Sequence, residues 1–381
     1  MAATGSAIKN AIVTIKVLGV GGGGNSVLLR MAKDKLAAVE LIAINTDAKQ
    51  LAQLQQAGVT PLQIGEKVTK GRGTGGNLEL GETAAKADEE KIRAALKGSD
   101  LVFVTAGMGG GAGTGAAPVV AKIAKDMGIL TVGVVTVPFS FEGQRKQRLA
   151  NEGIVKMQAH MDALIAVHND NLMKLPENRH MSLVQAFAAA DGILRQAIRC
   201  IAEMILTTGV INVDFADVTS IFRQSESSDA ILGIGESDTG SAVRAVRQAI
   251  ESPLIEKSLA GARGVILNIS GDECLSLFEV NEATQYIYEN THPDVNIIFG
   301  TVIEKGMGSK VRATIVATDF ADSLIRKSPQ LGNVEKKLGT VSLELPDFMG
   351  QQAPPALKFH ASDGTVIPPF RPTGTKPEEK K

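Results

Sequence analysis

The sequence holds 381 residues, of which 44% are hydrophobic and 21% are charged, with a formal net charge of −1. A chain of this length exceeds one ordinary core and suits two domains plus a tail, and its near-neutral charge excludes an overall basic field for nucleic acid or an anionic membrane. Two cysteines without a CxxC spacing argue against a disulfide framework or a structural zinc and favour a reducing cytoplasm, and the lack of a run of about 18 apolar residues predicts no direct membrane insertion.

The first predicted strand, residues 12–18, leads into the glycine-rich run 19–26 and then into a helical segment, residues 27–36. A glycine run between a strand and a helix is a candidate phosphate loop, because the N–H groups at a helix N-terminus attract anions. The run also contains the G-x-G-x-x-G fingerprint of dinucleotide-binding folds, and an acid, Asp47, follows the next strand. These residues alone therefore leave an NAD-dependent dehydrogenase as a possible function.

The second predicted strand, residues 39–44, ends in the polar turn 45–47. Polar residues at the carboxyl end of a parallel strand face the ligand crevice. A third glycine cluster, residues 71–77, is either part of the same site or a surface turn. The composition of residues 79–97 predicts a helix.

The densest glycine cluster in the chain is GMGGGAGTG, residues 107–115, which lies between a predicted strand at 101–105 and a predicted helix that starts near Ala116. Six glycines in nine residues let the backbone bend and bring several N–H groups against one bulky ligand. A flexible linker would need neither a buried strand before it nor a helix after it. We therefore interpret this cluster as a phosphate-binding loop.

Two further strands are predicted at residues 130–137 and 163–167. A helix begins near residues 139–146 after the first, and the polar residues 168–170 follow the second. This alternation of strands and helices predicts an α/β fold with a doubly wound parallel sheet and a ligand at the carboxyl ends of its strands.

A long apolar periodicity over residues 182–206 predicts a single helix, interrupted only weakly by Gly192. A helix of about 25 residues is roughly 37 Å long, enough to cross one domain and join it to the next. The region after it predicts a second set of strands and helices without a glycine loop, which we interpret as a supporting α/β domain. Its predicted strands are 230–234, 265–269, 295–299 and 311–317, and its predicted helices are 218–223, 240–250 and 275–288.

The last part of the chain has a composition that cannot bury a core. Residues 321–342 are polar with mixed charge, and residues 350–381 are rich in proline. Two short apolar islands, 343–349 and 366–370, interrupt it, and each has the form of a short docking peptide.

Five motifs together resemble the FtsZ family, the bacterial tubulin homologues that polymerise for cell division. They are GVGGGGN at 19–25, NTDA at 45–48, GMGGGAGTGAAPVV at 107–120, PFSFEG at 138–143 and NVDFAD at 212–217. The resemblance covers residues 10–320 and implies a tubulin/FtsZ-like α/β fold. Its parts would be a flexible N-terminus (1–10), a Rossmann-like GTP-binding domain (11–180), a long central helix (181–208), a smaller activation domain (209–320), and a disordered linker and tail (321–381) with a partner-binding peptide near 343–349.

The resemblance also implies a set of nucleotide-binding residues. Glu142 matches the acid that contacts the ribose, Phe187 matches the residue that stacks on guanine, and Asp191 matches the carboxylate that accepts from guanine N1–H and the exocyclic amine. Adenine offers no such donor pair, so Asp191 implies GTP over ATP. The whole set is Gly21, Gly22, Gly23, Gly24, Asn25, Asn45, Gly73, Gly75, Gly110, Gly111, Ala112, Gly113, Thr114, Gly115, Glu142, Lys146, Asn169, Phe187 and Asp191.

Three residues match the family's catalytic loop, Asn212, Asp214 and Asp217, which reaches the γ-phosphate of the next subunit. Two carboxylates can orient a water for in-line attack, with Mg²⁺ held by the phosphates rather than by a protein metal site. Such an arrangement implies head-to-tail filaments and hydrolysis that requires assembly. Asp214 is also placed to cap a helix, and the two roles can coexist.

Two residues depart from the family's pattern. Ala112 stands where a threonine is usual and removes one hydroxyl donor to the γ-phosphate, and a hydrogen bond to a charged group is worth about 1.5–3 kcal/mol. Lys146 stands in place of an arginine and offers a point charge instead of a fork, although Arg145 lies beside it. These departures predict slower turnover or weaker GTP binding.

The favoured function is therefore a GTPase that polymerises at the mid-cell division site in the cytoplasm. Its expected partners are further copies of itself and, through the peptide at 343–349 or the one at 366–370, division-ring and membrane-anchor proteins, with no nucleic acid. The alternative is a nucleotide-binding paralogue that co-assembles and hydrolyses weakly. A dehydrogenase is disfavoured because it needs no second glycine loop.

Overall fold

The computed structural model describes residues 13–34, 38–175, 178, 180–207, 211, 213–225, 227–272, 275–304 and 306–320. The chain divides into one unit over residues 1–327 and another over residues 328–381, and the second lies wholly outside the described residues. Residues 1–10, the tail at 321–381 and both predicted docking peptides also lie outside the described residues.

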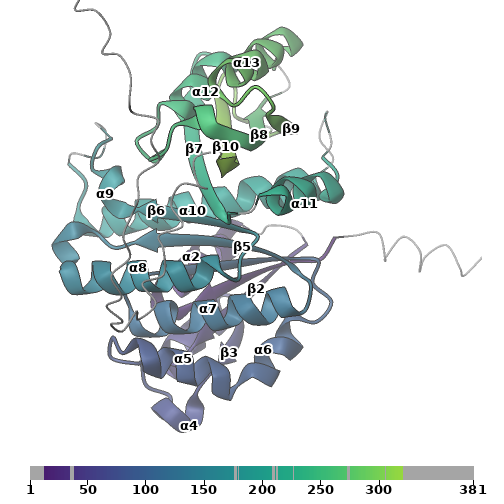
Figure 1. Ribbon diagram of the computed structural model, residues 1–381. Coiled ribbons are helices and arrows are strands. Elements are labelled where there is room, and N and C mark those ends of the chain that lie inside the picture. Colours follow the sequence, from purple (N-terminus) through teal and green to yellow (C-terminus); the bar gives the residue numbers. More distant parts are fainter. Residues whose placement is uncertain are drawn as a thin grey trace, which may run out of the picture. The chain divides into compact units, whose positions relative to one another are not determined.

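Ten strands of the described residues form one sheet in the order β3-β2-β1-β4-β5-β6-β7-β10-β8-β9 (Figure 1). The six N-terminal strands all pair in parallel, as expected. They are β1 (Ile15–Val20), β2 (Val39–Asn45), β3 (Thr60–Gln63), β4 (Leu101–Gly107), β5 (Leu130–Val137) and β6 (Ala163–His168).

The four C-terminal strands continue the same sheet. They are β7 (Asp229–Ser237), β8 (Ala262–Gly271), β9 (Asn296–Ile303) and β10 (Val311–Phe320). Strand β10 pairs antiparallel with β7 and β8, and β9 pairs in parallel with β8. Only two pairs in parallel register, Leu164 with Asp229 and Ile165 with Ala230, join β6 to β7, so the link between the two halves is narrow.

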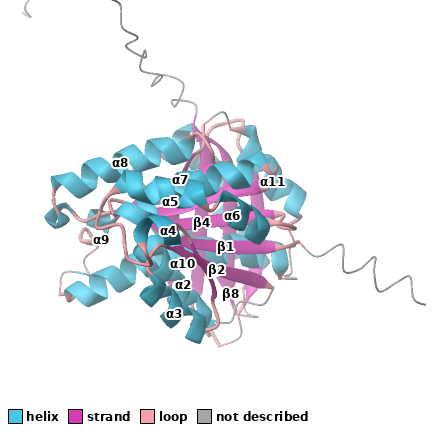
Figure 2. Ribbon diagram, turned by 90° about the horizontal axis from the view of Figure 1, so that it is seen from below, coloured by secondary structure: helices cyan, strands magenta, loops and turns pink. Residues whose placement is uncertain are grey.

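Helices cover both faces of the N-terminal half of the sheet (Figure 2). One face carries α2 (Gly21–Asp34), α3 (Ala48–Gln56) and α10 (Leu183–Leu206), and the other carries α5 (Leu78–Ala87), α6 (Glu89–Leu96), α7 (Gly111–Asp126) and α8 (Gln144–Gln158). The remaining helices are α4 (Glu66–Thr69), α9 (Asn169–Leu172), α11 (Phe215–Gln224), α12 (Ala242–Ile250), α13 (Leu277–Asn290) and the 3₁₀ turns η1 (Ser140–Glu142) and η3 (Leu259–Gly261). No helix within the described ranges has both the length and the apolar character needed to cross a bilayer.

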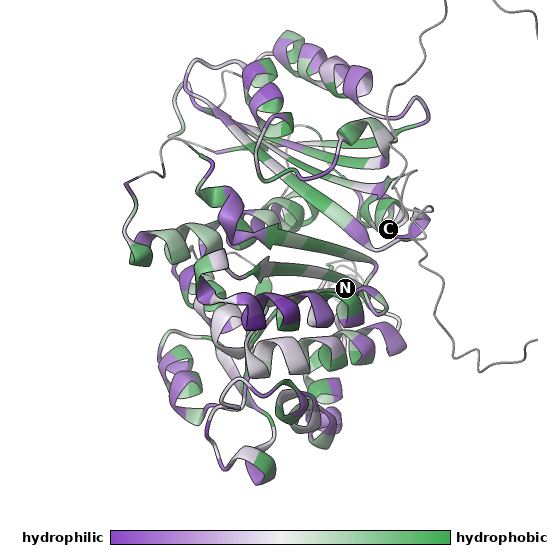
Figure 3. Ribbon diagram, turned by 60° about the vertical axis from the view of Figure 1, so that its left-hand side comes forward, coloured by the Kyte–Doolittle hydropathy of each residue, from purple (hydrophilic) through white to green (hydrophobic). Residues whose placement is uncertain are grey.

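The core follows from the alternation of side chains along the central strands. In β4, Phe103 packs with α2 and α10, and its neighbour Val104 packs with α5 and α7 on the other face. The strands are accordingly apolar on both faces and are mostly green in Figure 3. This is the pattern of a buried parallel sheet, and it confirms the predicted fold class.

Helix α10 is the long element that the periodicity predicts, and it begins one residue later than expected because Ser182 serves as its N-cap. The Ser182 hydroxyl accepts from Gln185 N–H at 3.3 Å, and the Gln185 side chain accepts in return from Ser182 N–H at 2.8 Å. Its 24 residues span about 36 Å. In Figure 1 it runs from α9 to α11.

Several local expectations were wrong. Helix α2 begins at Gly21 and not at residue 27, so the first glycine run is itself helical. The segment 79–97 is two helices, because Asp88 ends α5 and its carboxylate accepts from Gly65 N–H at 2.7 Å. Strand β3 and helix α3 have no counterpart among the predicted elements.

We expect Gly192→Ala to raise the thermal stability of the protein. A Cβ atom at Gly192 meets nothing within 4 Å, and alanine is favoured over glycine in a helix interior by about 1 kcal/mol. The contrasting variant is Gly235→Ala in β7, where a Cβ would lie 2.1 Å from the carbonyl oxygen of Ala245, so a loss of about 1–3 kcal/mol is expected. Thermal melting measures both, and equal shifts for the two variants would contradict the packing described here.

Candidate functional site

Two glycine-rich helix starts lie side by side at the carboxyl edge of the sheet. Strand β1 runs directly into α2 at Gly21, and the neighbouring strand β4 leads through residues 108–110 into α7 at Gly111. Neither helix has an acidic residue in its first turn, and no side chain caps α7 at Gly110. The N–H groups of both first turns, with their positive dipole ends, therefore suit an anion such as a phosphate.

The glycines at the start of α2 are required by packing within the chain. Gly21 has φ of +70°, and a Cβ atom there would lie 2.5 Å from the backbone nitrogen of Gly113. A Cβ at Gly23 would lie 2.8 Å from Gly107, and one at Gly24 would lie 2.3 Å from the carbonyl oxygen of Thr105. Gly22 is different, since its Cβ would meet only the Gln50 side chain, at 3.5 Å.

The glycines of the central cluster, residues 107–115, are also of two kinds, those that packing requires and one that faces open space. Cβ atoms at Gly111 and Gly115 would strike the backbone around the start of α5, 2.7 Å from Asn77 and 2.1 Å from Leu78. Gly113 packs against the end of β1. Gly110 is the one glycine of this cluster where a Cβ atom would meet nothing within 4 Å, so the space in front of the α7 N-terminus is open.

Other residues of the central loop support it from within. The buried Thr114 hydroxyl accepts from Gly109 N–H at 2.8 Å. Ala112 is partly exposed and presents only a methyl group. The predicted contact of these two residues with a γ-phosphate stays a prediction.

A buried amide network joins the start of α2 to the end of β2. Asn45 Nδ2 donates to Gln50 at 2.8 Å, and Asn45 Oδ1 accepts from the N–H groups of Thr46 and Asp47. With its amide turned to satisfy both ends, Asn25 accepts from Asn45 Nδ2 at 2.8 Å and donates to the carbonyls at the start of α2. The network fixes the turn at residues 46–47 between β2 and α3, and the exposed Gln50 is a member that the motif search did not identify.

The third glycine cluster lies beside the same network. Ala48 N–H donates to the carbonyl of Gly71 at 3.2 Å, and the buried Thr74 lies against Gly111. A Cβ atom at Gly73 or Gly75 would meet no other atom within 4 Å, and Gly75 has a φ of +59°. The packing is consistent with a part in the site and disfavours a detached surface turn.

Glu142 and Lys146 form an ion pair at 2.9 Å on the first turns of η1 and α8. The other Glu142 oxygen accepts from Phe139 N–H at 3.0 Å, so both oxygens are engaged. The backbone carbonyl of Lys146 packs against Gly109 of the central loop. Lys146 therefore lies beside the glycine loop with its charge already paired, and Arg145 next to it is exposed.

Phe187, predicted to stack on the base, lies near the N-terminal end of α10, and Asn169, predicted to bind the nucleotide, lies in α9. The Phe187 ring stands edge-on to buried Phe139, 5.4 Å between centroids, and is 39% exposed, so one face is open. Asn169 is buried, and its side-chain oxygen has no hydrogen-bond partner within the structure described. A buried amide without a partner is costly, and a ligand would supply the missing donor.

Asp191 is held by an arginine that the sequence did not single out. Arg30 Nε of α2 donates to Asp191 Oδ2 at 2.9 Å. Burial raises the pKa of Asp191, and the hydrogen bond and charge of Arg30 act in the opposite direction. Arg30 follows the glycine run by six positions on α2, but no motif distinguishes it from any exposed helix arginine.

The acidic pair lies at the other end of α10. Asp214 is the N-cap of α11 and accepts from Ala216 N–H at 3.4 Å, which confirms the capping role. Asp217 follows in the first turn, and both side chains are exposed. Within the described ranges, no hydrogen bond or ion pair joins them to the glycine loops, and Asn212 lies outside those ranges.

The arrangement brings two glycine-rich helix N-termini to one edge of the sheet, and α9 and α10 add a partly exposed aromatic ring, a carboxylate and a buried amide oxygen without a partner. That combination suits a nucleotide, with phosphates on the helix starts and a base near α10. In the described part of the chain, no group of three or more His, Cys, Asp or Glu side chains could hold a metal.

Both domains of the chain are similar to proteins of known family. The GTPase domain of the tubulin/FtsZ family matches residues 14–177, and the C-terminal domain of the FtsZ family matches residues 228–321. An empty FtsZ dimer from M. jannaschii is similar at 39% identity and a TM-score of 0.77, over 83% of this chain and 90% of that one. A point mutant of M. jannaschii FtsZ is similar at 38% identity and a TM-score of 0.78, over 84% and 95%. A GTPγS-bound protofilament of CetZ2 from Haloferax volcanii shares the fold, at 22% identity and a TM-score of 0.67, over 82% and 96%.

We expect Gly24→Ala to destabilise the protein by about 1–3 kcal/mol, because its Cβ would collide with the Thr105 carbonyl. The control is Gly22→Ala in the same loop, whose Cβ meets only a flexible side chain and which should melt within a few degrees of the parent. If Gly24→Ala were as stable as Gly22→Ala, the backbone contact between α2 and β4 would not be needed.

Proposed function

The chain belongs to the FtsZ family of GTPases, and we propose that it binds GTP at the helix starts of α2 and α7 and hydrolyses it after head-to-tail assembly. The observation that carries the proposal is the pair of glycine-rich helix starts at neighbouring strands, without an acidic residue in either first turn, together with Phe187, Asp191 and Asn169 on α10 and α9. GTP binding and self-association belong to the family, and the residue roles given below are our proposals.

The phosphates of GTP would lie on the first turns of α2 and α7. Gly22 and Gly110 are the glycines whose Cα atoms face open space or a flexible side chain, so the backbone N–H groups near them are the accessible ones. The loop that contains Gly73 and Gly75 would close over the terminal phosphate. Mg²⁺ bound through the phosphates would offset their negative charge.

The base would lie between Phe187 and the side chains of Asn169 and Asp191. An ionised Asp191 can accept from N1–H and the 2-amino group of guanine, and the unpartnered Asn169 oxygen can accept one further N–H. Adenine lacks the N1–H donor and the 2-amino group. Guanine specificity follows from this donor pattern, provided that Asp191 is ionised.

Hydrolysis would be completed by Asp214 and Asp217 of an adjoining subunit. The pair lies beyond the far end of α10, about 36 Å of helix from the cap at Ser182, so one subunit cannot bring its own acids to its own nucleotide without large rearrangement. A contact between unlike ends of successive copies repeats without closing and makes a filament. In that contact the two carboxylates would orient the attacking water.

The place of action proposed is the division ring of a cell, in the cytoplasm. Docking of division-ring and membrane-anchor proteins through the peptide at 343–349, or through the one at 366–370, is proposed from their sequences alone. Both lie outside the described residues.

We expect GTP affinity to fall as the pH is lowered, and to fall at higher pH in Arg30→Gln. Binding needs ionised Asp191, so affinity is full above the pKa of Asp191 and is lost below it, by about tenfold per pH unit. Removing Arg30 removes the group that lowers this pKa, so the loss should begin at higher pH. The measurement is the Kd of a fluorescent, non-hydrolysable GTP analogue from pH 5 to 8.

Arg93→Gln is the control, since Arg93 pairs with Glu89 on α6, away from the site. The dependence of its Kd on pH should be the same as that of the parent protein. Superimposable curves for the parent and Arg30→Gln would contradict the role given to the Arg30–Asp191 pair.

We expect phosphate release per subunit to be near zero at low protein concentration and to rise above a threshold. Asp217→Asn should lower the rate above the threshold by about 10²-fold or more while leaving GTP binding unchanged, because the carboxylate acts on another subunit's nucleotide. The measurement is phosphate release with GTP and Mg²⁺ across a dilution series.

A rate per subunit that does not depend on concentration would place all the catalytic groups in one chain. GTP binding without any release would instead identify the paralogue that co-assembles and hydrolyses poorly, and the departures at Ala112 and Lys146 would then be its cause.

A further inference from the structure

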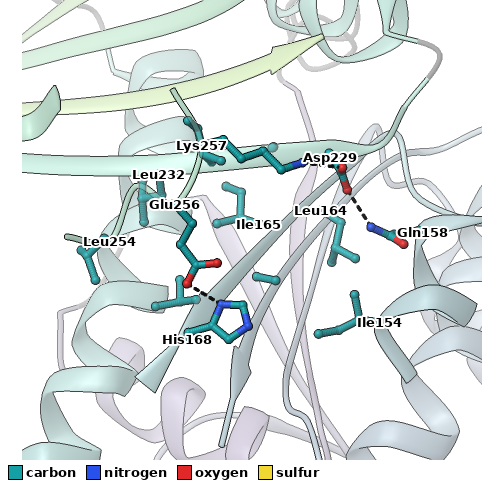
Figure 4. A pocket seen from close by; sticks show the side chains of 14 residues that line it. Ile154, Gln158, Leu164, Ile165, His168, Asp229, Leu232, Leu254, Glu256 and Lys257 are labelled. Atoms are coloured by element: carbon teal, nitrogen blue, oxygen red, sulfur yellow. Dashed lines mark hydrogen bonds and ion pairs between the residues drawn. The ribbon is translucent and has the colours of Figure 1, made fainter. Parts of the chain in front are cut away.

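A short segment of the C-terminal half is attached to the N-terminal half at the edge of the nucleotide site. Residues 254–257, here called the strap, follow α12 and contact three separate elements of the other half. Leu254 packs with the apolar group of Phe139, Leu172 and Ala190. Glu256 and Lys257 make the polar contacts, and Figure 4 shows them directed to different partners.

Glu256 reaches two residues on either side of Asn169. Its Oε1 atom accepts from Asn171 Nδ2 at 2.5 Å and lies 2.6 Å from His168 Nδ1, where the contact is one of distance and charge without a hydrogen bond. Asn171 is buried, so the contact satisfies an amide that would otherwise lose a partner. The two contacts therefore lie on either side of Asn169, whose own side-chain oxygen has no partner within the described structure.

Helix α9 depends on such contacts for its position. It has four residues, Asn169–Leu172, and so short a helix is not stable by its own hydrogen bonds. From the N-terminal half, Asp170 accepts from Ser140 N–H at 2.9 Å and Asn178 donates to the Leu172 carbonyl at 2.8 Å. The strap adds the contacts at His168 and Asn171.

We propose that Glu256 is a positioning residue for the nucleotide, which holds α9 through Asn171 and His168 and so aims Asn169 at the base. The proposal rests on the proposed function, because it takes Asn169 as a nucleotide contact. It adds that the C-terminal half sets the affinity of a site to which it contributes no contact of its own. By linkage, bound nucleotide also favours the attached strap.

The surroundings of the strap allow it to be attached or released. A cavity of about 150 Å³ lies under it, lined by parts of β6 and β7 where only two residue pairs join the halves. Glu256 is 42% exposed, so its side chain can leave its partners without unfolding the core. The strap can therefore follow small displacements of one half against the other.

Lys257 provides a matched control on the same strap. Its Nζ atom lies 2.7 Å from Asp229 Oδ2, and the other Asp229 oxygen accepts from Gln158 at 2.6 Å. Lys257 is 47% exposed, a fraction similar to that of Glu256, and its own contacts are with Asp229 of β7 and the ring of Phe320 in β10, not with α9. Lys257→Ala loosens the strap without touching α9.

The test measures the Kd for a fluorescent GDP analogue with the full chain, kept below its assembly threshold. Glu256→Ala should weaken binding by about fivefold or more, a usual size for coupling between sites. Glu256→Gln keeps an oxygen acceptor for Asn171 and should retain most of the affinity, and Lys257→Ala should bind as the parent does. In an Asn169→Ala background, Glu256→Ala should have no further effect, because both act through one side chain.

An unchanged Kd for Glu256→Ala would overturn the proposal, as would equal weakening by Lys257→Ala or the same loss with Asn169→Ala present. If Asn169→Ala binds too weakly to measure, the comparison of Glu256→Ala and Glu256→Gln with Lys257→Ala decides alone. Failure of the parent to bind GDP or GTP would instead overturn the proposed function. Circular dichroism and melting of each variant separate loss of folding from loss of binding.

Discussion

Backbone-to-backbone contact at the start of two helices is the constraint on which the site depends. Helices α2 and α7 can begin side by side only because Gly21, Gly24 and Gly113 have no side chain, since a Cβ atom at any of them would lie within 3 Å of a neighbouring backbone atom. The same closeness brings two sets of unpaired N–H groups to one edge of the sheet, where an anion can use both. Tight packing and phosphate binding therefore have one cause.

The long helix α10 separates two chemical functions. Its N-terminal part carries Phe187, which packs against Phe139, and Asp191, which pairs with Arg30, and beyond its C-terminal end Asp214 caps α11 with its side chain exposed. In our proposal the separation makes each subunit half of two active sites. Assembly and hydrolysis are then coupled by geometry, and no separate regulatory element is needed for that coupling.

The two halves of the sheet meet at only two residue pairs, so side-chain contacts at this seam carry much of the communication between them. The Glu256 contacts with α9 are one such route, and the hydrogen bond from Gln158 of α8 to Asp229, which Lys257 holds from its own half, is another. Both pairs are partly exposed, and exposed ion pairs contribute little to stability. Their value in our proposal is positional, because they fix where a short helix lies.

Regular elements with strong periodicity could be predicted from the sequence. The strand at Leu130–Val137 and the helix at Leu183–Leu206 agree with the pattern to within one residue, since a buried strand and a core-facing helix each impose their own spacing on apolar residues. The start of α2 could not be predicted, because glycine disfavours a helix and only the packing against β4 compensates for that. Asp88 likewise ends α5 through a contact with Gly65, 23 residues away.

The order of motifs along the chain was enough to indicate the family, the α/β fold and the chemistry of the ligand, because glycine loops, cap residues and apolar periods are local properties. Tertiary structure alone decided which glycines serve packing and which leave open space, that Arg30 holds Asp191, and that Glu256 reaches α9 across 85 residues of chain. These contacts join residues far apart in sequence. No local pattern records them, because their energies depend on how the two halves of the sheet pack together.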